Sequence, residues 1–416
     1  MAEYEIIGGK KLCGEYTLQR AKNSALAIMC ASVMCRGETY IEKCPNISDV
    51  FTLSKILKRL GAVTETDSGG LYIDARNVYL TTIPEKLSEK LRASLFLVGP
   101  LIARFKSASF FSPGGCSIGT RPIDIHIDGL KALGAKVGHR ENRLDFFAPK
   151  LTGGRIRLKY PSVGATENLM SCAVLAAGET VIENCAREPE IKDLQDYLNL
   201  CGAKIFGAGT GKITVCGVEK LHGGVSFEPI ADRIEAGSLI LAALAVGGEM
   251  TISGLKAENI LNLTEKICDN ACKISIYNDK IYIKIDGRPK GFGHVVTAPY
   301  PGFPTDLHPQ LAACAATADG RTSITETVFD SRFKYVDRLI RFGADMRVEK
   351  DRVEITGKKL HGAQATATDL RGGMALVIAA MAAEGRSIIK DVSHIERGYE
   401  RLPEKLSALG ADVARL

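Results

Sequence analysis

Tryptophan is absent from this sequence, and aromatic residues make up only 6% of its 416 residues. Proteins that bind single-stranded nucleic acid stack the bases on aromatic rings, so this class is disfavoured. Basic residues are hardly in excess, because 54 Lys and Arg residues are balanced by 48 Asp and Glu residues. An excess of six positive charges, dispersed along the chain, predicts no nucleic-acid or membrane partner, but it suits a cavity that holds anions.

Long apolar runs are also missing. The longest, Leu239–Val246, is far too short to cross a bilayer. The first twelve residues carry Glu3, Glu5 and Lys10 and have no apolar core, so they do not resemble a signal peptide. We therefore expect a cytoplasmic protein.

The chain lacks metal-ligand spacings as well. Its twelve cysteines are scattered, no Cys-x-x-Cys pair occurs, and the seven histidines show no ligand spacing. Cys30, Cys172 and Cys314 lie within apolar helical patterns, as buried thiols of a reducing compartment do. The sequence therefore predicts no metal site.

What the chain does contain is a repeat that runs from end to end. A step of the type Leu-Gly-Ala, typical of a helix end followed by a strand, recurs at intervals of 73, 68, 69, 72 and 67 residues. Its copies are Gly61-Ala62, Gly134-Ala135, Gly202-Ala203, a degenerate Ala271-Cys272, Gly343-Ala344 and Gly410-Ala411. A second marker, a glycine followed by β-branched residues, keeps the same period and has lost its glycine at Lys106. Six repeats of about 70 residues therefore fill the chain.

Each repeat contains one amphipathic helix, such as Asp49–Leu60, and one helix that is apolar on nearly all faces. The apolar helices are Ser24–Cys35, Ala93–Ala103, Asn168–Ala177, Ala236–Val246, Gln310–Ala318 and Met374–Ala383. A helix that is apolar all round must be buried on every side. With several short strands per repeat, this pattern predicts an α/β protein of two globules with three repeats each. The helices lie inside and the sheets outside, unlike in a doubly wound parallel sheet.

Polar and charged residues precede every buried helix. The helices begin just after Lys22-Asn23, Arg92, Ser162–Thr166, Asp232-Arg233, Thr305-Asp306 and Asp369–Arg371. Helix N-termini attract anions through their free N–H groups and the helix dipole. Ordinary N-capping by Ser162, Asp232 and Asp369 is the alternative, but capping requires no basic side chain, and four of these starts carry one. We therefore expect a ligand site where the two sets of helix starts face an inter-domain cleft.

A second group of polar segments follows the strands. It comprises Pro113–Pro122 in repeat two, Glu326–Arg332 in repeat five and His394–Arg397 in repeat six. The glycines of the first segment predict a mobile loop that acts as a lid. Cys116 lies among these glycines and close in sequence to Arg121, and a thiol held near cations tends toward reactivity. We therefore expect a functional role for Cys116.

Taken together, six segments resemble those of one family, the UDP-N-acetylglucosamine 1-carboxyvinyltransferases of bacterial peptidoglycan synthesis. They are Lys22-Asn23, Arg92-Ala-Ser, Pro113-Gly-Gly-Cys-Ser-Ile-Gly-x-Arg-Pro122, Ser162–Thr166, Phe303–Asp306 and His394–Arg401. The resemblance implies the enolpyruvyl transferase fold, a two-domain inside-out α/β barrel whose N-terminal strand completes the second domain. The first domain would span residues 22–230 and carry the cysteine loop, and the second would span 1–21 plus 231–416.

The resemblance also implies the reaction. The enolpyruvyl group of phosphoenolpyruvate would pass to the 3-hydroxyl of UDP-N-acetylglucosamine by addition and then elimination of phosphate. No metal, organic cofactor or obligate protein partner would be needed. Cys116 would donate a proton to the enol carbon and could also form a thioether with the donor, and Asp306 would take the hydroxyl proton. Lys22 and Arg397 complete the expected catalytic set.

The remaining site residues follow from the same resemblance. Phosphoenolpyruvate would be held by Lys22, Asn23, Arg121, Arg371 and Arg397. The sugar nucleotide would contact Asn23, Arg92, Arg121, Pro122, Ile123, Asp124, Ile125, Ser162, Val163, Gly164, Thr305, Asp306, Val328 and Phe329. Asp369, Arg332 and Arg233 would support the site, with Asp369 holding a proton or the developing charge.

Two positions depart from the family's pattern. Tyr160 stands where some members carry a lysine near the uridine diphosphate, and Arg20 stands where a small residue is usual. The first departure weakens any direct charge contact at that position. Neither touches the expected chemistry.

Two alternatives stay open. The enolpyruvyl transferase that acts on shikimate 3-phosphate shares the fold and the donor, but it lacks the Gly-Gly-Cys-Ser-Ile-Gly loop. A non-catalytic nucleotide-sugar-binding paralogue should have lost Cys116, Asp306 or Arg397, and all three are present.

Overall fold

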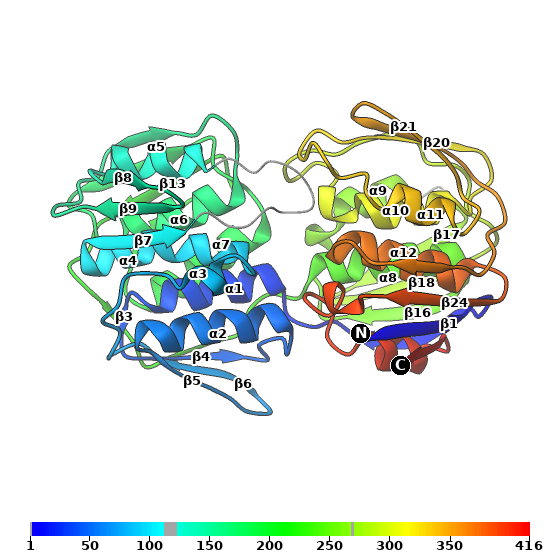
Figure 1. The fold of residues 1–416 in the computed structure, drawn as a ribbon, viewed down its shortest axis with the longest axis horizontal. Helices are drawn as coiled ribbons and strands as arrows, with labels where there is room; N and C mark the ends of the chain where they lie inside the picture. Colours follow the sequence, from blue (N-terminus) through cyan, green and yellow to red (C-terminus); the bar gives the residue numbers. More distant parts are fainter. Residues whose placement is uncertain (1, 112–122, 268–269) are drawn as a thin grey trace. The chain divides into compact units, whose positions relative to one another are not determined.

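The structure is a computed structural model that describes residues 2–111, 123–267 and 270–416. The chain divides into two compact units, each with its own hydrophobic core (Figure 1). The first unit comprises the described residues from Arg20 to Ile230. The second unit comprises the described residues up to Gln19 together with those from Ala231 to Leu416.

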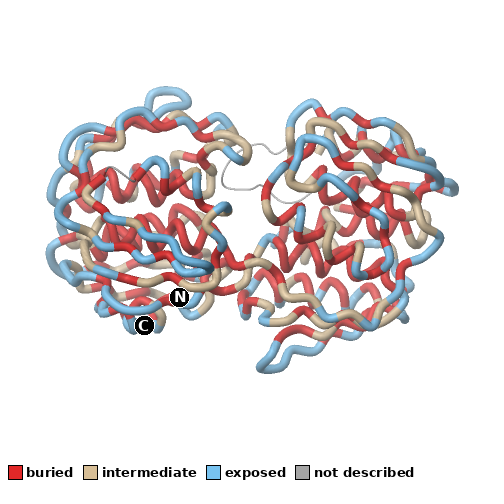
Figure 2. The backbone as a smooth tube through the Cα atoms, turned by 180° about the vertical axis from the view of Figure 1, so that it is seen from behind, coloured by how far each residue is buried: buried red, intermediate tan, exposed pale blue. Residues whose placement is uncertain are grey.

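Three helical segments run through the core of each unit. In the first unit they are α1 (Lys22–Ser32), the 3-10 turn η1 (Arg92–Leu97) continued by α4 (Val98–Phe105), and α6 (Val163–Ala173). In the second unit they are α8 (Arg233–Val246), η3 (Thr305–Leu307) continued by α10 (His308–Ala315), and α12 (Leu370–Ala382). Residues 233–244 of α8 and 371–381 of α12 are all buried, and Figure 2 shows these helices inside their units. The predicted interior helices are confirmed.

A second set of helices is amphipathic. It comprises α2 (Ser48–Leu60), α5 (Asp124–Ala132), α7 (Pro189–Leu200), α9 (Leu261–Ile267), α11 (Val336–Ile340) and α13 (Leu402–Ala408). In α2, Leu53, Leu57 and Leu60 recur at helical spacing and are buried. Burying each such side chain contributes roughly 1.5–3 kcal/mol. Short helices η2 (Ala257–Asn259), α3 (Glu85–Ser88) and η4 (Val392–His394) complete the set.

The repeat markers have a common backbone conformation. Gly61 and Gly343 follow helix ends with φ values of 107° and 86°, in the left-handed region that glycine adopts without a steric penalty. The degenerate fourth copy keeps this conformation, because Ala271 has a φ of 52°. Lys106, which replaces the glycine of the second marker, has a φ of 64°. The repeat geometry thus persists where the glycine is lost.

Short sheets surround the helices. In the first unit, β15 (Val225–Phe227), β4 (Glu38–Glu42), β6 (Gly70–Asp74) and β5 (Val63–Thr66) form one sheet in this order. Another contains β7 (Ser107–Phe111), β9 (Arg143–Phe147) and β8 (Lys136–Arg140). A third contains β10 (Arg155–Arg157), β11 (Glu179–Glu183), β13 (Lys212–Cys216) and β12 (Lys204–Phe206). A small parallel pair joins β14 (Leu221–His222) to β3 (Cys35–Arg36).

The second unit has three sheets of four strands among its described residues. The first contains, in spatial order, β17 (Cys272–Tyr277), β18 (Lys280–Ile285), β16 (Gly248–Ser253) and β2 (Leu12–Thr17). The second contains β19 (Gly293–Val296), β20 (Arg321–Thr325), β22 (Arg352–Thr356) and β21 (Asp345–Glu349). The third contains β23 (Gln364–Thr366), β24 (Arg386–Lys390), β1 (Glu3–Ile7) and β25 (Asp412–Arg415). β2 runs parallel to β16 with Leu12 opposite Gly248, and β1 lies antiparallel between β24 and β25. The N-terminal strands therefore complete two sheets of the second unit, as the resemblance implies.

Candidate active site

The three buried helices of the second unit start at a common point. The Tyr399 hydroxyl lies 2.7 Å from Ser238 Oγ on α8 and 3.3 Å from both Gln310 Nε2 on α10 and Arg371 Nη1 on α12. Ser238 donates its own proton to the Ile234 carbonyl, so the Tyr399 hydroxyl donates to Ser238 and accepts from the other two. Tyr399 was not among the predicted site residues, although it lies within the His394–Arg401 motif.

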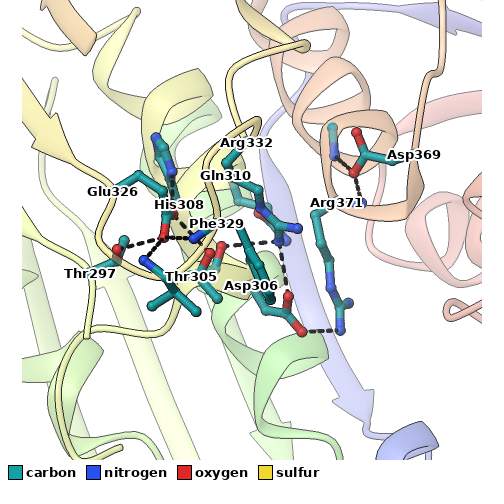
Figure 3. Close-up of polar contacts among 12 residues, drawn as sticks. Thr297, Thr305, Asp306, His308, Gln310, Glu326, Phe329, Arg332, Asp369 and Arg371 are labelled. Atoms are coloured by element: carbon teal, nitrogen blue, oxygen red, sulfur yellow. Dashed lines mark hydrogen bonds and ion pairs between the residues drawn. The ribbon is translucent and has the colours of Figure 1, made fainter. Parts of the chain in front are cut away.

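Asp306 lies between two buried guanidinium groups (Figure 3). Its Oδ1 is 2.9 Å from Arg332 Nη2, and its Oδ2 is 3.1 Å from Arg371 Nη2. The side chains of the two arginines are 2% and 7% exposed, whereas that of Asp306 is 30% exposed. Charge-assisted hydrogen bonds of this kind are roughly twice as strong as hydrogen bonds between neutral groups. The structure therefore brings together three predicted site residues.

The start of α12 holds Arg371 in place. Asp369 Oδ1 accepts from the backbone N–H groups of Arg371 and Gly372, each at 3.0 Å, which is an N-cap. Burial lowers the pKa of the Arg371 guanidinium, but the negative charge of Asp306, together with Tyr399 and Asp232, outweighs this and raises the pKa above its ordinary value. The guanidinium also lies over the Tyr399 ring, 5.8 Å from its centroid. Arg371 therefore stays charged.

A buried carboxylate, Glu326, lies next to this cluster (Figure 3). It accepts hydrogen bonds from the Thr305 hydroxyl at 2.8 Å and from the backbone N–H groups of Val328 and Phe329 at 2.8 and 3.2 Å. His308 Nδ1 lies 2.9 Å from Glu326 Oε2. In the sequence, Glu326 stands at the start of a predicted polar segment, and His308 was not among the predicted site residues.

The other predicted residues of the second unit lie on neighbouring segments. Arg397 is half-buried between η4 and α13, close in sequence to Tyr399. Arg233 begins α8, and its guanidinium lies 5.5 Å from the centroid of the Tyr300 ring.

In the first unit, Lys22 begins α1 and pairs with Asp49 of α2. The Nζ–Oδ2 distance is 2.8 Å, and the two side chains are 13% and 5% exposed. Asn23 is the next residue and is exposed.

Arg92 and Gly164 are brought together through His126. His126 Nδ1 lies 3.1 Å from Asn168 Nδ2 of α6, and a Cβ atom added at Gly164 would lie 3.4 Å from the His126 ring. Burial, helped by the charge of Arg92, lowers the pKa of His126 to about 3. The imidazole is therefore neutral and accepts a hydrogen bond from Asn168.

Ser162 caps α6, because its hydroxyl accepts from the Ala165 N–H at 3.4 Å. Val163 starts the helix, and Tyr160 just before it is 38% exposed. Ile123 is the N-cap residue of α5, and Asp124 and Ile125 form its first turn. Cys116, Arg121 and Pro122 lie outside the described residues.

The departure at Arg20 has a structural explanation. Its guanidinium forms an ion pair with Glu228, which also binds Lys43 Nζ at 3.0 Å. Arg20 is thereby tied to the loop that follows β15 at the other end of the first unit's chain.

A cavity of about 480 Å³ lies at the opposite ends of the first unit's buried helices. Met34, Ala103 and Ala176 line it, just at or after the C-terminal turns. Two of its cations, Arg104 and Lys106, bind carbonyl oxygens there, as basic groups at helix C-termini do. None of the described site residues lines this cavity.

Among the described residues, no helix has the length and apolar character needed to cross a membrane. The described part of the chain also contains no group of three or more metal-ligand side chains arranged around a common point.

Comparison with known sequences gives full-length relatives. A sequence profile described as EPSP synthase (3-phosphoshikimate 1-carboxyvinyltransferase) matches residues 6–406. UDP-N-acetylglucosamine 1-carboxyvinyltransferase 2 of Caldanaerobacter subterraneus subsp. tengcongensis is 44% identical over 417 residues, which is 100% of both chains. UDP-N-acetylglucosamine 1-carboxyvinyltransferase of Trichlorobacter lovleyi is 43% identical over 413 residues, which is 99% of this chain and 98% of the relative.

Solved structures share the fold. The enolpyruvyl transferase NikO from Streptomyces tendae superimposes with a TM-score of 0.89 at 24% identity, over 100% of this chain and 98% of that one. EPSP synthase from Acinetobacter baumannii gives a TM-score of 0.75 at 18% identity, over 100% of both chains. The predicted inside-out α/β architecture is confirmed by these similarities.

Proposed function

This chain belongs to the EPSP synthase family and, within it, to the UDP-N-acetylglucosamine 1-carboxyvinyltransferases, and we propose that it transfers the enolpyruvyl group of phosphoenolpyruvate to the 3-hydroxyl of UDP-N-acetylglucosamine. The products are the enolpyruvyl ether and phosphate. This is the first committed step of peptidoglycan synthesis. The observation that carries the proposal is full-length identity of 44% and 43% to relatives of that name.

The donor carries a carboxylate and a phosphate, so it needs several cations. Lys22, Arg121, Arg371 and Arg397 supply them, and Asn23 adds a polar contact. The buried position of Arg371 supports this assignment, because a buried guanidinium is screened little by water. Its planar fork suits either anion of the donor.

The acceptor hydroxyl is activated by Asp306. Both carboxylate oxygens are bound by arginines in the structure, so a hydroxyl proton must compete with Arg332 and Arg371 for them. When the donor binds, its negative charges also interact with Arg371, so Arg371 stabilises the Asp306 carboxylate less. Asp306 then accepts a proton more readily than it does without the donor. We propose that this sequence of binding makes Asp306 effective only when the donor is in place.

The chemical steps are balanced as follows. Cys116 gives its thiol proton to the methylene carbon of the enol, and the acceptor oxygen attacks the adjacent carbon as its proton passes to Asp306. The tetrahedral adduct then loses a methyl proton, which returns to the thiolate, and the phosphate leaves with the proton that Asp306 had taken. Positioned proton donors and acceptors contribute about 10²–10⁴-fold each to such reactions.

The sugar nucleotide would lie along residues 121–125, Arg92 and Ser162–Gly164, with Thr305, Val328 and Phe329 near the sugar. Placement of Arg92 and Gly164 around the same buried His126 supports one binding surface in the first unit. Asp369, Arg332 and Arg233 would support the site.

We place the reaction in the cytoplasm with no protein partner required. The described cysteines form no disulfides with one another, and most are buried, which suits a reducing compartment.

Phosphate release with each candidate acceptor tests the proposal. With phosphoenolpyruvate as donor, UDP-N-acetylglucosamine should sustain turnover and shikimate 3-phosphate should not. Turnover with shikimate 3-phosphate alone would overturn the choice of acceptor. Binding of the sugar nucleotide without turnover by wild type would favour the non-catalytic alternative.

A further inference from the structure

Glu326 is a fully buried carboxylate that meets five hydrogen-bond donors. Its Oε1 accepts from the Thr297 hydroxyl at 2.9 Å and from the Val328 and Phe329 N–H groups at 2.8 and 3.2 Å. Its Oε2 accepts from the Thr305 hydroxyl at 2.8 Å and lies 2.9 Å from His308 Nδ1. The side chains of Glu326 and His308 are both 0% exposed.

The protonation states of this pair follow from their neighbours. Burial lowers the pKa of His308, so the imidazole is neutral. Its Nδ1–H donates to Glu326, and its Nε2 accepts from the Tyr335 hydroxyl at 2.9 Å. Burial raises the pKa of Glu326, but the bonds from His308, Thr305 and the Val328 amide outweigh this and place it below its ordinary value. Glu326 is therefore an anion that meets only donors.

This carboxylate joins two segments of the acceptor side. One is the loop after β20, where Thr327 N–H donates to Thr297 Oγ1 at 3.0 Å. With the Val328 and Phe329 N–H groups bound to Glu326, three successive backbone amides of this loop are hydrogen-bonded. The other is η3, where Thr305 directly precedes Asp306. A single buried group thus fixes the loop relative to the proposed proton acceptor.

We infer that Glu326 is a positioning residue for the acceptor, acting through Val328, Phe329 and Thr305. The inference rests on the proposed function, because these residues are there assigned to the sugar nucleotide. Glu326 touches neither substrate in this account. Its charge is what allows one side chain to serve five donors, and a neutral amide cannot do so.

Glu326→Gln is the sharpest test, since it keeps the size and removes the charge. The NH2 group of glutamine must take the place of one of the two carboxylate oxygens and then faces hydrogen-bond donors. Either the loop amides or Thr305 therefore lose their acceptor. We expect the KM for UDP-N-acetylglucosamine to rise roughly ten- to a hundredfold, in line with the loss of one or two bonds to a charged group. The KM for phosphoenolpyruvate should change less than twofold.

Glu235→Gln is the matched control. Glu235 is also a buried carboxylate of the second unit, and it accepts from the Tyr16 hydroxyl at 2.7 Å and the Gln19 N–H at 2.8 Å. Its hydrogen bonds go to Tyr16, Gln19 and Lys405 rather than to the loop, so its variant should lose stability without a change in acceptor KM. Thr297→Val, which removes one donor without changing charge, should raise acceptor KM in the same direction as Glu326→Gln and serves if that variant does not fold.

Hydrogen exchange gives a readout that needs no turnover. The amides of Val328 and Phe329 should exchange at least tenfold faster in Glu326→Gln than in wild type or Glu235→Gln. Unchanged exchange and unchanged acceptor KM would overturn the inference. If wild type does not act on UDP-N-acetylglucosamine, the proposed function and the acceptor role fail together, while faster exchange would still establish Glu326 as the anchor of the loop.

Discussion

Asp306 Oδ2 and Arg371 Nη2 lie 3.1 Å apart and join the starts of two buried helices, η3–α10 and α12. Removing one partner of a buried ion pair leaves the other charge uncompensated, which typically costs 3–5 kcal/mol. Here Arg371 is the buried partner and Asp306 is partly exposed, so the fold relies on Asp306 to compensate the buried charge of Arg371.

Asp306→Asn should lower kcat by roughly 10²–10⁴-fold, because the amide cannot take the acceptor proton. The KM for phosphoenolpyruvate should not rise, since Arg332 and Arg371 are then more available to an anion. Steady-state kinetics with both substrates varied measures the two effects separately. A variant with wild-type kcat would remove Asp306 from its assigned role.

Cys116→Ser should abolish the covalent adduct that wild type forms with phosphoenolpyruvate. The thiol is the proposed proton donor and can also attack the donor carbon, whereas a hydroxyl is a far weaker nucleophile. Intact-mass spectrometry after incubation with the donor detects the adduct. Inactivation by an epoxide phosphonate of the fosfomycin kind should likewise be lost in Cys116→Asp, and an inactivated Cys116→Asp protein would contradict the assignment.

His126→Gln should make the free energy of unfolding depend less steeply on pH below about pH 6.5. Unfolded histidine titrates near 6.5 and folded His126 near 3, so between these values the unfolded chain binds the extra proton and stability falls as the pH is lowered. The slope from this one group is at most about 1.4 kcal/mol per pH unit.

Urea unfolding of wild type and His126→Gln at several pH values between 7 and 4.5 measures the difference. Asp193 acts in the opposite direction, because burial raises its pKa to about 6, but it is present in both proteins and cancels in the comparison. Parallel profiles would show that His126 is not the group responsible.

Ala271→Gly should stabilise the second unit. Ala271 has a φ of 52°, a conformation that costs an L-residue roughly 1–2 kcal/mol and glycine nothing. After the greater flexibility of glycine in the unfolded chain is subtracted, a gain of about 0.5–1 kcal/mol remains, or a Tm rise of roughly 1–4 °C. Gly343→Ala is the converse control at an equivalent helix end, where the added Cβ would lie 2.9 Å from the His361 ring. A lower Tm for Ala271→Gly would contradict this reading.

Much of the fold could be predicted from the sequence because its repeat is strong. Helices without a polar face, such as α8, are stable only in the interior of a domain. This predicted that the helices lie inside and the sheets outside. Helix boundaries were less predictable. Residues 305–307 form a 3-10 turn ahead of α10, and apolar periodicity carries no signal for such a turn.

The site was predictable only in part. Asp306, Arg332 and Arg371 were predicted from polar segments and from the family resemblance and are in contact, yet neither signal indicated that both arginines bind the same carboxylate. Tyr399, Glu326 and His308 were missed as positioning groups. Their roles depend on contacts between segments far apart in the chain, such as Tyr399 with Ser238, and no local spacing records such contacts.

Analysis of the reaction product in deuterated water tests the central claim most directly. After incubation with phosphoenolpyruvate, UDP-N-acetylglucosamine should be recovered heavier by one enolpyruvyl unit, with deuterium in its methylene group, because protonation and deprotonation of that carbon exchange hydrogen with solvent. Recovery of unmodified UDP-N-acetylglucosamine would contradict the transfer, and a product without deuterium would contradict addition and elimination.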